Sequence, residues 1–340
     1  MRSVTLAFLL PLGLLMATPT AHAQVPAPVP ACTITDPELG ELSGLVADGE
    51  HWFATNDGGT SVTVFVLGKD CQVQDVITGP IDPYDVEDLA LGPDGTFWLS
   101  DTGDNDGDRD TVALLSLTPA GESTLYRLTY PDGKHDAEAL LLDRAGTPYL
   151  ITKSPLGTAD VYRPAAPLTS PGPTPLEHVV SVRLSSTDTP GGPVPGVVGS
   201  VTVTGAAATP DGTAIALRTY TDAYLFPVTD GDIVAAFSAK SVRVPLPNEA
   251  QGEAIAFQPD GSLLSASEGV GQPVTVVAGA ARLVAPKPPP VKPEPESASD
   301  VSESQPAEDG LPPIPAAVVT IVMISVVYLL FRWLRRRKSY

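Results

Sequence analysis

Three glutamates occupy the same place in three similar stretches of the sequence. Glu87, Glu138 and Glu253 each come near the start of an apolar run that reads as a β-strand. A carboxylate at the head of a buried strand needs a positive partner, water or a metal ion, because burying an unpaired charge is costly. If these strands lie side by side, the glutamates converge into a ligand or metal pocket. An ion-pair network that only orders the fold remains an alternative.

Charged residues also stand near the end of the strand that follows each turn. They are Asp101, Lys153, Arg218 and Glu268. We expect them to meet the three glutamates, with Lys153 and Arg218 as the positive partners. The predicted ligand-binding set is Glu87, Asp101, Glu138, Lys153, Arg218, Glu253 and Glu268. Because side chains alternate along a strand, Glu87 should share a face with Leu89 and Leu91.

Acid and base chemistry has one histidine candidate near this site. His135 precedes Glu138 by three residues, so the two form a candidate catalytic pair. A loop histidine that is hydrogen-bonded for structure is the alternative. The sequence contains no Gly-x-Ser-x-Gly elbow, Walker loop, His-Glu-x-x-His or dinucleotide fingerprint.

An acidic loop follows the second of these strand pairs. Asp101, Asp104, Asp106 and Asp108 fall close together, and carboxylate oxygens at such spacing suit calcium. The run does not match an EF-hand, because Arg109 stands where that loop requires glycine. We therefore consider calcium a possible cofactor, with a solvated acidic loop as the alternative.

A strand, a turn ending in glycine and a second strand recur five times. The copies begin at Leu42, Val86, Ala137, Val203 and Gly252, and their turns end at Gly49, Gly95, Gly146, Gly212 and Gly261. Four of the five turns are Asp-Gly, which tolerates positive φ and favours a tight hairpin. Such repetition predicts a repeat architecture.

Two more strand-like runs follow most copies, as at 112–117 and 124–129. Four antiparallel strands per repeat predict an all-β fold, a β-propeller with five blades. Residues 32–35 would supply the missing outer strand of the last blade. Six blades remain possible, because a blade could be hidden in the Pro/Gly-rich stretch 187–199, and two stacked β-sandwiches are another alternative. In a propeller, the glutamates and the ends of the second strands meet at one mouth, opposite the Asp-Gly turns.

The ends of the chain carry targeting signals. Residues 1–23 read as a signal peptide and 24–31 as a Pro-rich segment, followed by the propeller ectodomain at 32–285. Residues 286–313 form a Pro/Glu/Ser-rich stalk, 314–334 a transmembrane helix and 335–340 a basic cytoplasmic tail. This order predicts a single-pass type I protein of the cell membrane, with its propeller outside the cell.

Charge and cysteine content agree with export. The formal net charge of −20 argues against nucleic acid as a partner. The two cysteines, Cys32 and Cys71, lie in the exported part, where oxidising conditions favour a disulfide between them.

The repeats also carry a resemblance to a known family. The runs DVEDLALGPDGTFWLSDTGDN, HDAEALLLD and GEAIAFQPDGSLLSASEG are similar to those of secreted bacterial propellers described as phytase-like, or "esterase-like activity of phytase". The resemblance covers about residues 41–277. It implies a propeller fold, and propeller phytases hold calcium with carboxylates and phosphate with Lys and Arg.

Two functions follow from these observations. The first is a membrane-anchored propeller that binds an extracellular ligand or protein at its charged mouth without catalysis. The second is a calcium-dependent hydrolase of phosphoesters or esters, with Glu87, Asp101, Glu138 and Glu253 as metal ligands or acid and base groups.

Overall fold

The folded part of the chain consists almost entirely of β-strands. A computed structural model describes residues 25–194 and 196–285. The predicted signal peptide, the stalk, the transmembrane helix and the basic tail lie outside the described residues. In the part that is described, no helix has the length and apolar character needed to span a membrane.

The strands form antiparallel units of four. The first unit contains β2 (Leu42–Ala47), β3 (Trp52–Asn56), β4 (Thr63–Leu67) and β5 (Val73–Thr78). The next is β6 (Val86–Leu91), β7 (Phe97–Asp101), β8 (Val112–Leu117) and β9 (Ser123–Thr129). It joins β10 (Ala137–Leu142), β11 (Pro148–Thr152), β12 (Thr158–Pro164) and β13 (Thr174–Arg183) through a short parallel pairing of β9 with β13, so the two units make one eight-stranded sheet.

Two further units complete the set. One contains β14 (Val203–Ala208), β15 (Ala214–Thr219), β16 (Asp222–Pro227) and β17 (Val242–Pro245). The other contains β18 (Gly252–Phe257), β19 (Leu263–Ser267), β20 (Pro273–Val277) and the N-terminal β1 (Val29–Thr33). The short helices are η1 (Pro37–Leu39), α1 (Val197–Val201), α2 (Ile233–Ser238) and η2 (Ala280–Leu283).

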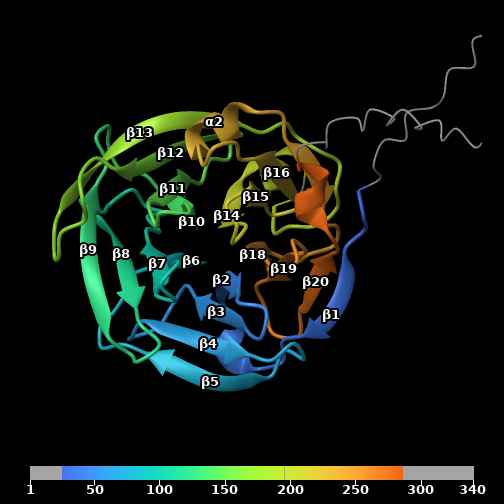
Figure 1. Cartoon of the computed structure of the whole chain (residues 1–340), viewed down its shortest axis with the longest axis horizontal. Helices are drawn as coiled ribbons and strands as arrows, with labels where there is room; N and C mark the ends of the chain where they lie inside the picture. Colours follow the sequence, from blue (N-terminus) through green and yellow to red (C-terminus); the bar gives the residue numbers. More distant parts are fainter. Residues whose placement is uncertain (1–24, 195, 286–340) are drawn as a thin grey trace, which may run out of the picture. The chain divides into compact units, whose positions relative to one another are not determined.

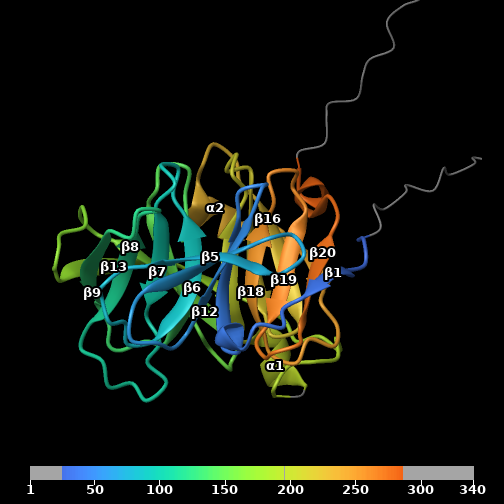
Figure 2. The ribbon, with the colours of Figure 1, turned by 90° about the horizontal axis from the view of Figure 1, so that it is seen from below.

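The units surround a common axis, with β2, β6, β10, β14 and β18 innermost (Figure 1). Each of the five hydrophobic clusters packs one unit against the next, and one cluster joins the last unit to the first. Figure 2 shows the same sheets from the side, with α1 and α2 at opposite ends of the axis. This all-β arrangement of four-stranded sheets is consistent with a β-propeller. In the described part of the 187–199 stretch there is no strand, and its only regular structure is the start of α1.

The turn chemistry was predicted correctly. All five turn glycines have positive φ, between 68° and 101°. Such values favour glycine because it has no Cβ to clash. At Gly95, the amide donates to the carbonyl oxygen of Gly92 at 3.0 Å, and the Asp94 carboxylate accepts from the Thr96 amide at 3.1 Å. The turn glycines at 146, 212 and 261 donate in the same way, whereas the first hairpin has a shorter loop, closed by the Asp48 amide donating to the carbonyl oxygen of His51 at 3.2 Å.

The two chain ends meet at one sheet. β1 pairs antiparallel with β20, which confirms that an N-terminal strand containing Cys32 supplies the outer strand of the last unit. The strand begins at Val29, so it lies earlier than the predicted 32–35 and includes the end of the Pro-rich segment. The predicted disulfide between Cys32 and Cys71 is present, with a Cα–Cα distance of 5.8 Å, and it ties the last unit to the first.

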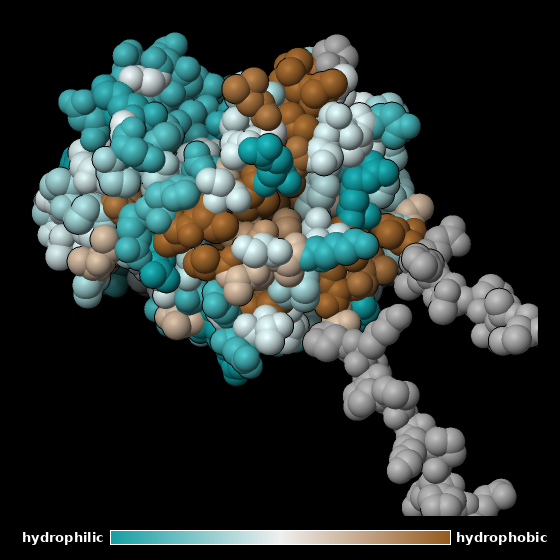
Figure 3. Space-filling model, turned by 90° about the horizontal axis from the view of Figure 1, so that it is seen from above, coloured by the Kyte–Doolittle hydropathy of each residue, from teal (hydrophilic) through white to brown (hydrophobic). Residues whose placement is uncertain are grey.

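The outer edge of the ring is mixed in polarity. In Figure 3, hydrophobic side chains reach the surface in the middle of one edge, among polar ones. Elsewhere, large apolar side chains such as Tyr84 and Leu156 are exposed on loops. Most apolar side chains of the innermost strands are instead buried between neighbouring sheets.

Candidate functional site

An acidic pocket lies at the end of the axis where the innermost strands begin. Its volume is about 130 Å³, and seven of its lining residues are acidic while only Lys153 is basic. Five residues of the predicted mouth line it: Glu87, Glu138, Lys153, Glu253 and Glu268. The predicted convergence of the three glutamates is therefore correct as geometry.

β-Bulges aim these glutamates at the axis. Every innermost strand shifts register at its second residue, which is Ser43, Glu87, Glu138, Thr204 or Glu253. A bulge adds one unpaired residue and redirects its side chain. Val86 and Leu89, which flank the bulge, pack into the same hydrophobic cluster. Simple alternation, which placed Glu87 on the face of Leu89, is therefore wrong at this position.

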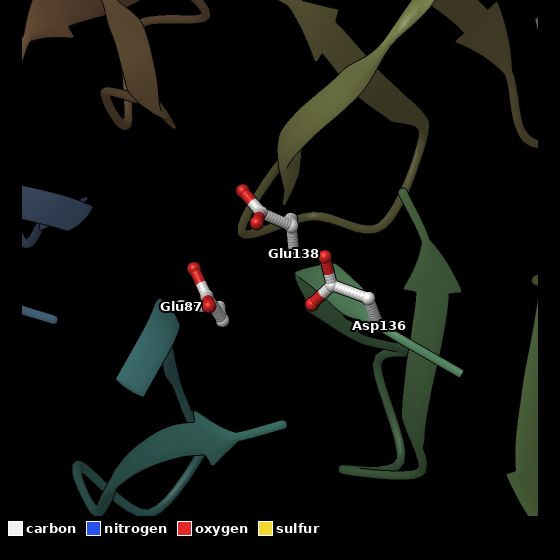
Figure 4. Close-up of side chains that lie close together, drawn as sticks. All are labelled: Glu87, Asp136 and Glu138. Atoms are coloured by element: carbon white, nitrogen blue, oxygen red, sulfur yellow. The ribbon is translucent and has the colours of Figure 1, made fainter. Parts of the chain in front are cut away.

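Three carboxylates come close enough to share one ion. One oxygen each from Glu87, Asp136 and Glu138 lies within 4.8 Å of the other two. Figure 4 shows Glu87 on one inner strand facing Asp136 and Glu138, which belong to the start of the next. Among the residues that the structure describes, no other group of three or more possible metal ligands is this compact.

Glu87 is the least compensated member of this cluster. Its side chain is only 7% exposed and lines the pocket. No hydrogen bond or ion pair within the described structure involves its carboxylate. Burial, together with the nearby charge of Glu138, raises the pKa of Glu87 to about 11. The carboxyl group therefore holds a proton at neutral pH unless a cation compensates its charge.

Glu138 has a partner, the ammonium group of Lys153. Burial raises the pKa of Glu138 more than Lys153 lowers it, and the result is about 7. Burial also opposes the charge on Lys153, but the Glu138 carboxylate raises the pKa of Lys153 above its ordinary value. Lys153 Nζ lies 4.0 Å from an oxygen of Asp136 as well. One ammonium group thus serves two carboxylates of the cluster.

Other acids of the pocket also have raised pKa values. Burial raises the pKa of Asp57 to about 6, with Glu41 adding to the effect. It also raises the pKa values of Asp85 and Glu253, with the charges of Asp136 and Glu138, respectively, as the next cause. These raised pKa values indicate that the pocket holds more acidic groups than Lys153 alone can neutralise.

Arg218 does not belong to the pocket, which corrects the predicted site. Its side chain is fully buried between sheets, where the guanidinium group donates to the carbonyl oxygens of Ala254 at 2.9 Å and Ala266 at 3.1 Å. It also forms an ion pair with Glu249 at 2.5 Å. Since all its donors point into the packed interior, Arg218 is a structural cation.

Asp101 is likewise absent from the pocket lining. Its carboxylate pairs with Arg109 at 2.9 Å and accepts from the Asp85 amide at 3.0 Å. These contacts hold the acidic loop against the segment before β6. Arg218 and Asp101 were both predicted to lie at the mouth. In the structure they stabilise the segments around it instead.

The acidic loop does not gather its aspartates around a common point. Asp104 accepts from the amides of Asp108 at 2.7 Å and Arg109 at 3.1 Å, so it caps the loop itself. Asp106 and Asp108 are exposed. The expected metal set of Asp101, Asp104, Asp106 and Asp108 is not among the compact groups of the described residues. The geometry favours the cluster around Glu87 instead.

His135 lies outside the pocket lining, which corrects its expected position beside Glu138. Its Nε2 atom is 3.0 Å from Asp132 Oδ1 and 3.1 Å from the Tyr162 hydroxyl. The ring packs edge-on to Tyr130. The structural alternative, a hydrogen-bonded loop histidine, agrees with these contacts.

Sequence reasoning missed several residues at the pocket. Asp85 and Asp136 each stand two residues before a bulged glutamate, and Gln251 takes the same place before Glu253. A polar residue two positions before the bulge was thus a repeated signal in the sequence. This signal lies just before each strand, outside the apolar repeat itself.

Asp88 closes the axis beneath the pocket. It is fully buried and follows Glu87 on β6. Its carboxylate accepts from the amides of Leu89 at 2.8 Å, Leu140 at 2.8 Å and Ala206 at 3.0 Å. Burial raises its pKa well above the ordinary value despite these donors. One side chain therefore links three innermost strands.

Comparisons with known proteins place the fold only broadly. No family model matches the chain, and no curated protein matches it. A gluconolactonase from Xanthomonas campestris is 14% identical, with 70% of this chain and 72% of that chain covered and a TM-score of 0.41. A glucose dehydrogenase is 12% identical, with 74% and 99% covered and a TM-score of 0.42. The β-propeller domain of Cps50 from Myceliophteria thermophila is 12% identical, with 74% and 99% covered and a TM-score of 0.40.

The chain is distantly similar to β-propellers. The activities in those names belong to those proteins, and the similarity identifies no family for this chain.

Proposed function

We propose that this protein is a five-bladed β-propeller, tethered outside the cell by one membrane span, that binds a divalent cation of the calcium class in its acidic pocket as part of ligand recognition. The observation that carries the proposal is Glu87. Its carboxyl group is nine-tenths buried, points into the pocket and has no partner among the described residues. A site that keeps such a group is suited to a ligand that supplies the missing positive charge.

The donor set fits a hard cation. Glu87, Asp136 and Glu138 offer oxygen atoms, and Asp85 and Asn105 add further oxygens nearby. Calcium prefers six to eight oxygen ligands, which protein carboxylates, amides and water can share. Lys153 already neutralises part of the cluster, so a cation would compete with its ammonium group for Glu138.

The proposed location outside the cell is argued from the sequence. The apolar run at 314–334 is followed directly by basic residues, and residues 1–23 have the features of a signal peptide. Both segments lie outside the described residues. The acidic pocket would then face the extracellular space, where calcium is abundant enough for weak sites to be filled.

Calcium titration of the full-length chain by isothermal calorimetry tests the proposal. We expect saturable binding that weakens about tenfold or more in Glu87→Gln, because an amide replaces one carboxylate of the cluster. Glu50→Gln makes the same chemical change on an exposed turn and should leave the affinity unchanged. Absence of calcium binding in the unmodified chain, or equal affinities in the two variants, would overturn the assignment.

A calcium-dependent hydrolase is the second candidate, and the pKa of Glu138 favours it. A carboxyl group with a pKa of about 7 can both accept and donate a proton near neutral pH, as a general acid or base must. The hydrolase proposal expects turnover of a phosphoester or an ester that requires calcium and is lost in Glu138→Gln. If the unmodified chain binds calcium without turning over either substrate class, recognition without catalysis remains.

A further inference from the structure

A second cavity opens at the other end of the axis, beside the Asp-Gly turns. Its volume is about 310 Å³, within the usual range for small-ligand pockets. The later residues of the five innermost strands form its wall, with half-buried apolar side chains such as Val46, Leu91 and Ala208. Pro93 and Pro210 stand at its rim. The cavity is therefore mostly apolar yet open to solvent.

This cavity is separate from the acidic pocket. The two have no lining residue in common. Between them lies Asp88, whose carboxylate is held by the amides of Leu140 and Ala206, two residues that line the apolar cavity. This carboxylate therefore bridges three of the five innermost strands between the two cavities.

One cation stands at the rim of the apolar cavity. Arg144 lines it, is exposed, and forms no ion pair within the described residues. The neighbouring Asp143 also lines the cavity, but it forms no ion pair with Arg144 within the described residues, and its Oδ1 atom accepts from the amides of Ala145 and Thr147, each at 2.8 Å. An exposed guanidinium group without an ion pair, beside an apolar cavity, favours an anion with an apolar body.

We propose that this cavity binds a small monocarboxylate with an aliphatic tail. The tail lies along the leucine and alanine wall, where it displaces water from apolar surface. The carboxylate remains at the rim, beside the Arg144 guanidinium group, where it keeps its contact with solvent. Neither contact involves the acidic pocket, so the inference is independent of the function proposed for that pocket.

Octanoate is the probe for the tail. We expect calorimetry to detect saturable octanoate binding to the full-length chain in nanodiscs, above the signal of empty nanodiscs. Ala208→Leu fills part of the cavity from β14 and should weaken binding about tenfold. Ala166→Leu adds the same atoms at an exposed position outside the cavity and should have no effect. No octanoate binding to the unmodified chain, or undiminished binding to Ala208→Leu, would overturn the proposal.

Octanol has an aliphatic tail like that of octanoate but no carboxylate, so comparing the two measures the contribution of the carboxylate. Arg144→Gln should weaken octanoate binding about threefold to fivefold and leave octanol binding unchanged, because a pairing at the exposed rim is partly screened by solvent. Arg183→Gln removes an exposed guanidinium group from outer strand β13 and serves as the matched control. Equal losses for octanoate and octanol in Arg144→Gln would contradict the role given to Arg144.

Discussion

Glu87 and Arg218 show how differently two charged residues of the same predicted mouth are used. Glu87 is buried at the pocket wall without a donor or cation bonded to it among the described residues, and its pKa is raised to about 11. Arg218 is buried among carbonyl oxygens and paired with Glu249. The first residue is available to a ligand, whereas the second holds two sheets together. Substituting each residue should therefore change stability in a different way.

Glu87→Gln should make stability less dependent on pH. The ordinary pKa of glutamate, 4.5, applies to the unfolded chain, and the folded value is about 11. Between these values the unfolded state ionises while the folded state keeps its proton, so the wild-type chain loses stability as pH rises. Glutamine does not titrate. In urea unfolding with EDTA, we expect the variant to gain about 1–4 kcal/mol relative to wild type between pH 5 and pH 8. A relative stability that is the same at both pH values would contradict the assignment.

Arg218→Leu should destabilise the fold by about 3–5 kcal/mol, because it leaves the buried Glu249 carboxylate without its partner. Adding Glu249→Leu should recover much of that loss. Chemical denaturation of the single and double variants measures both effects. If Arg218 were instead a ligand contact, the single variant would keep its stability and lose only binding.

At the scale of elements, the bulges at the starts of the innermost strands decide which side chains meet. The adjoining residues are small where sheets approach closely: a Cβ added at Gly44 would lie 2.5 Å from the Leu89 amide nitrogen, and one at Gly205 would lie 2.4 Å from the Glu253 carbonyl oxygen. The equivalent residue of β6 is Asp88, which has space to reach across the axis. Three of the five innermost strands, β6, β10 and β14, thus meet at one carboxylate.

Asp88→Ala should remove the hydrogen bonds that link β6 to β10 and β14. The amides of Leu140 and Ala206 would lose their acceptor in a buried site, and each unsatisfied donor costs about 1–3 kcal/mol. We expect a loss of about 2–6 kcal/mol in thermal or chemical unfolding. The exposed Asp82 is the control position, and Asp82→Ala should change stability by less than about 0.5 kcal/mol. A similar small change in Asp88→Ala would rule out its role at the axis.

At the scale of the whole molecule, the ring depends on joining its two ends. β1 adds the outer strand to the sheet that ends with β20, and the Cys32–Cys71 disulfide ties that sheet to the first unit. The hydrophobic cluster between these units contains Cys71, Leu45 and Val274. Strand pairing, side-chain packing and a covalent bond therefore act at the same junction.

Replacing both cysteines by serine should lower the unfolding free energy by about 3–4 kcal/mol, since the bond closes a loop of 39 residues. Denaturation in the presence and absence of dithiothreitol measures this contribution. The reductant should destabilise the wild-type chain and leave the double variant unaffected. Equal stability of the oxidised wild type and the double variant would show that the junction is held by packing and strand pairing alone.

The repeats made much of this architecture predictable. Strand positions and glycine turns follow from local periodicity and turn chemistry, which neighbouring residues control. The pairing of the N-terminal strand followed from the need to close the ring of repeats. The convergence of Glu87, Glu138 and Glu253 followed as well, because equivalent residues of a repeat occupy equivalent places around an axis. Local signals were sufficient for these features.

The partners of the charged groups were decided only in the tertiary structure. Whether Arg218 pairs with Glu249 or faces the mouth, and whether Asp88 finds amides on two other strands, depends on residues distant in the chain. A one-residue bulge also reverses the side-chain alternation that sequence reasoning assumes. The sequence by itself therefore determined the repeated sheets and the set of acidic residues, while the burial and hydrogen bonding that give each carboxylate its role arose from packing the sheets together.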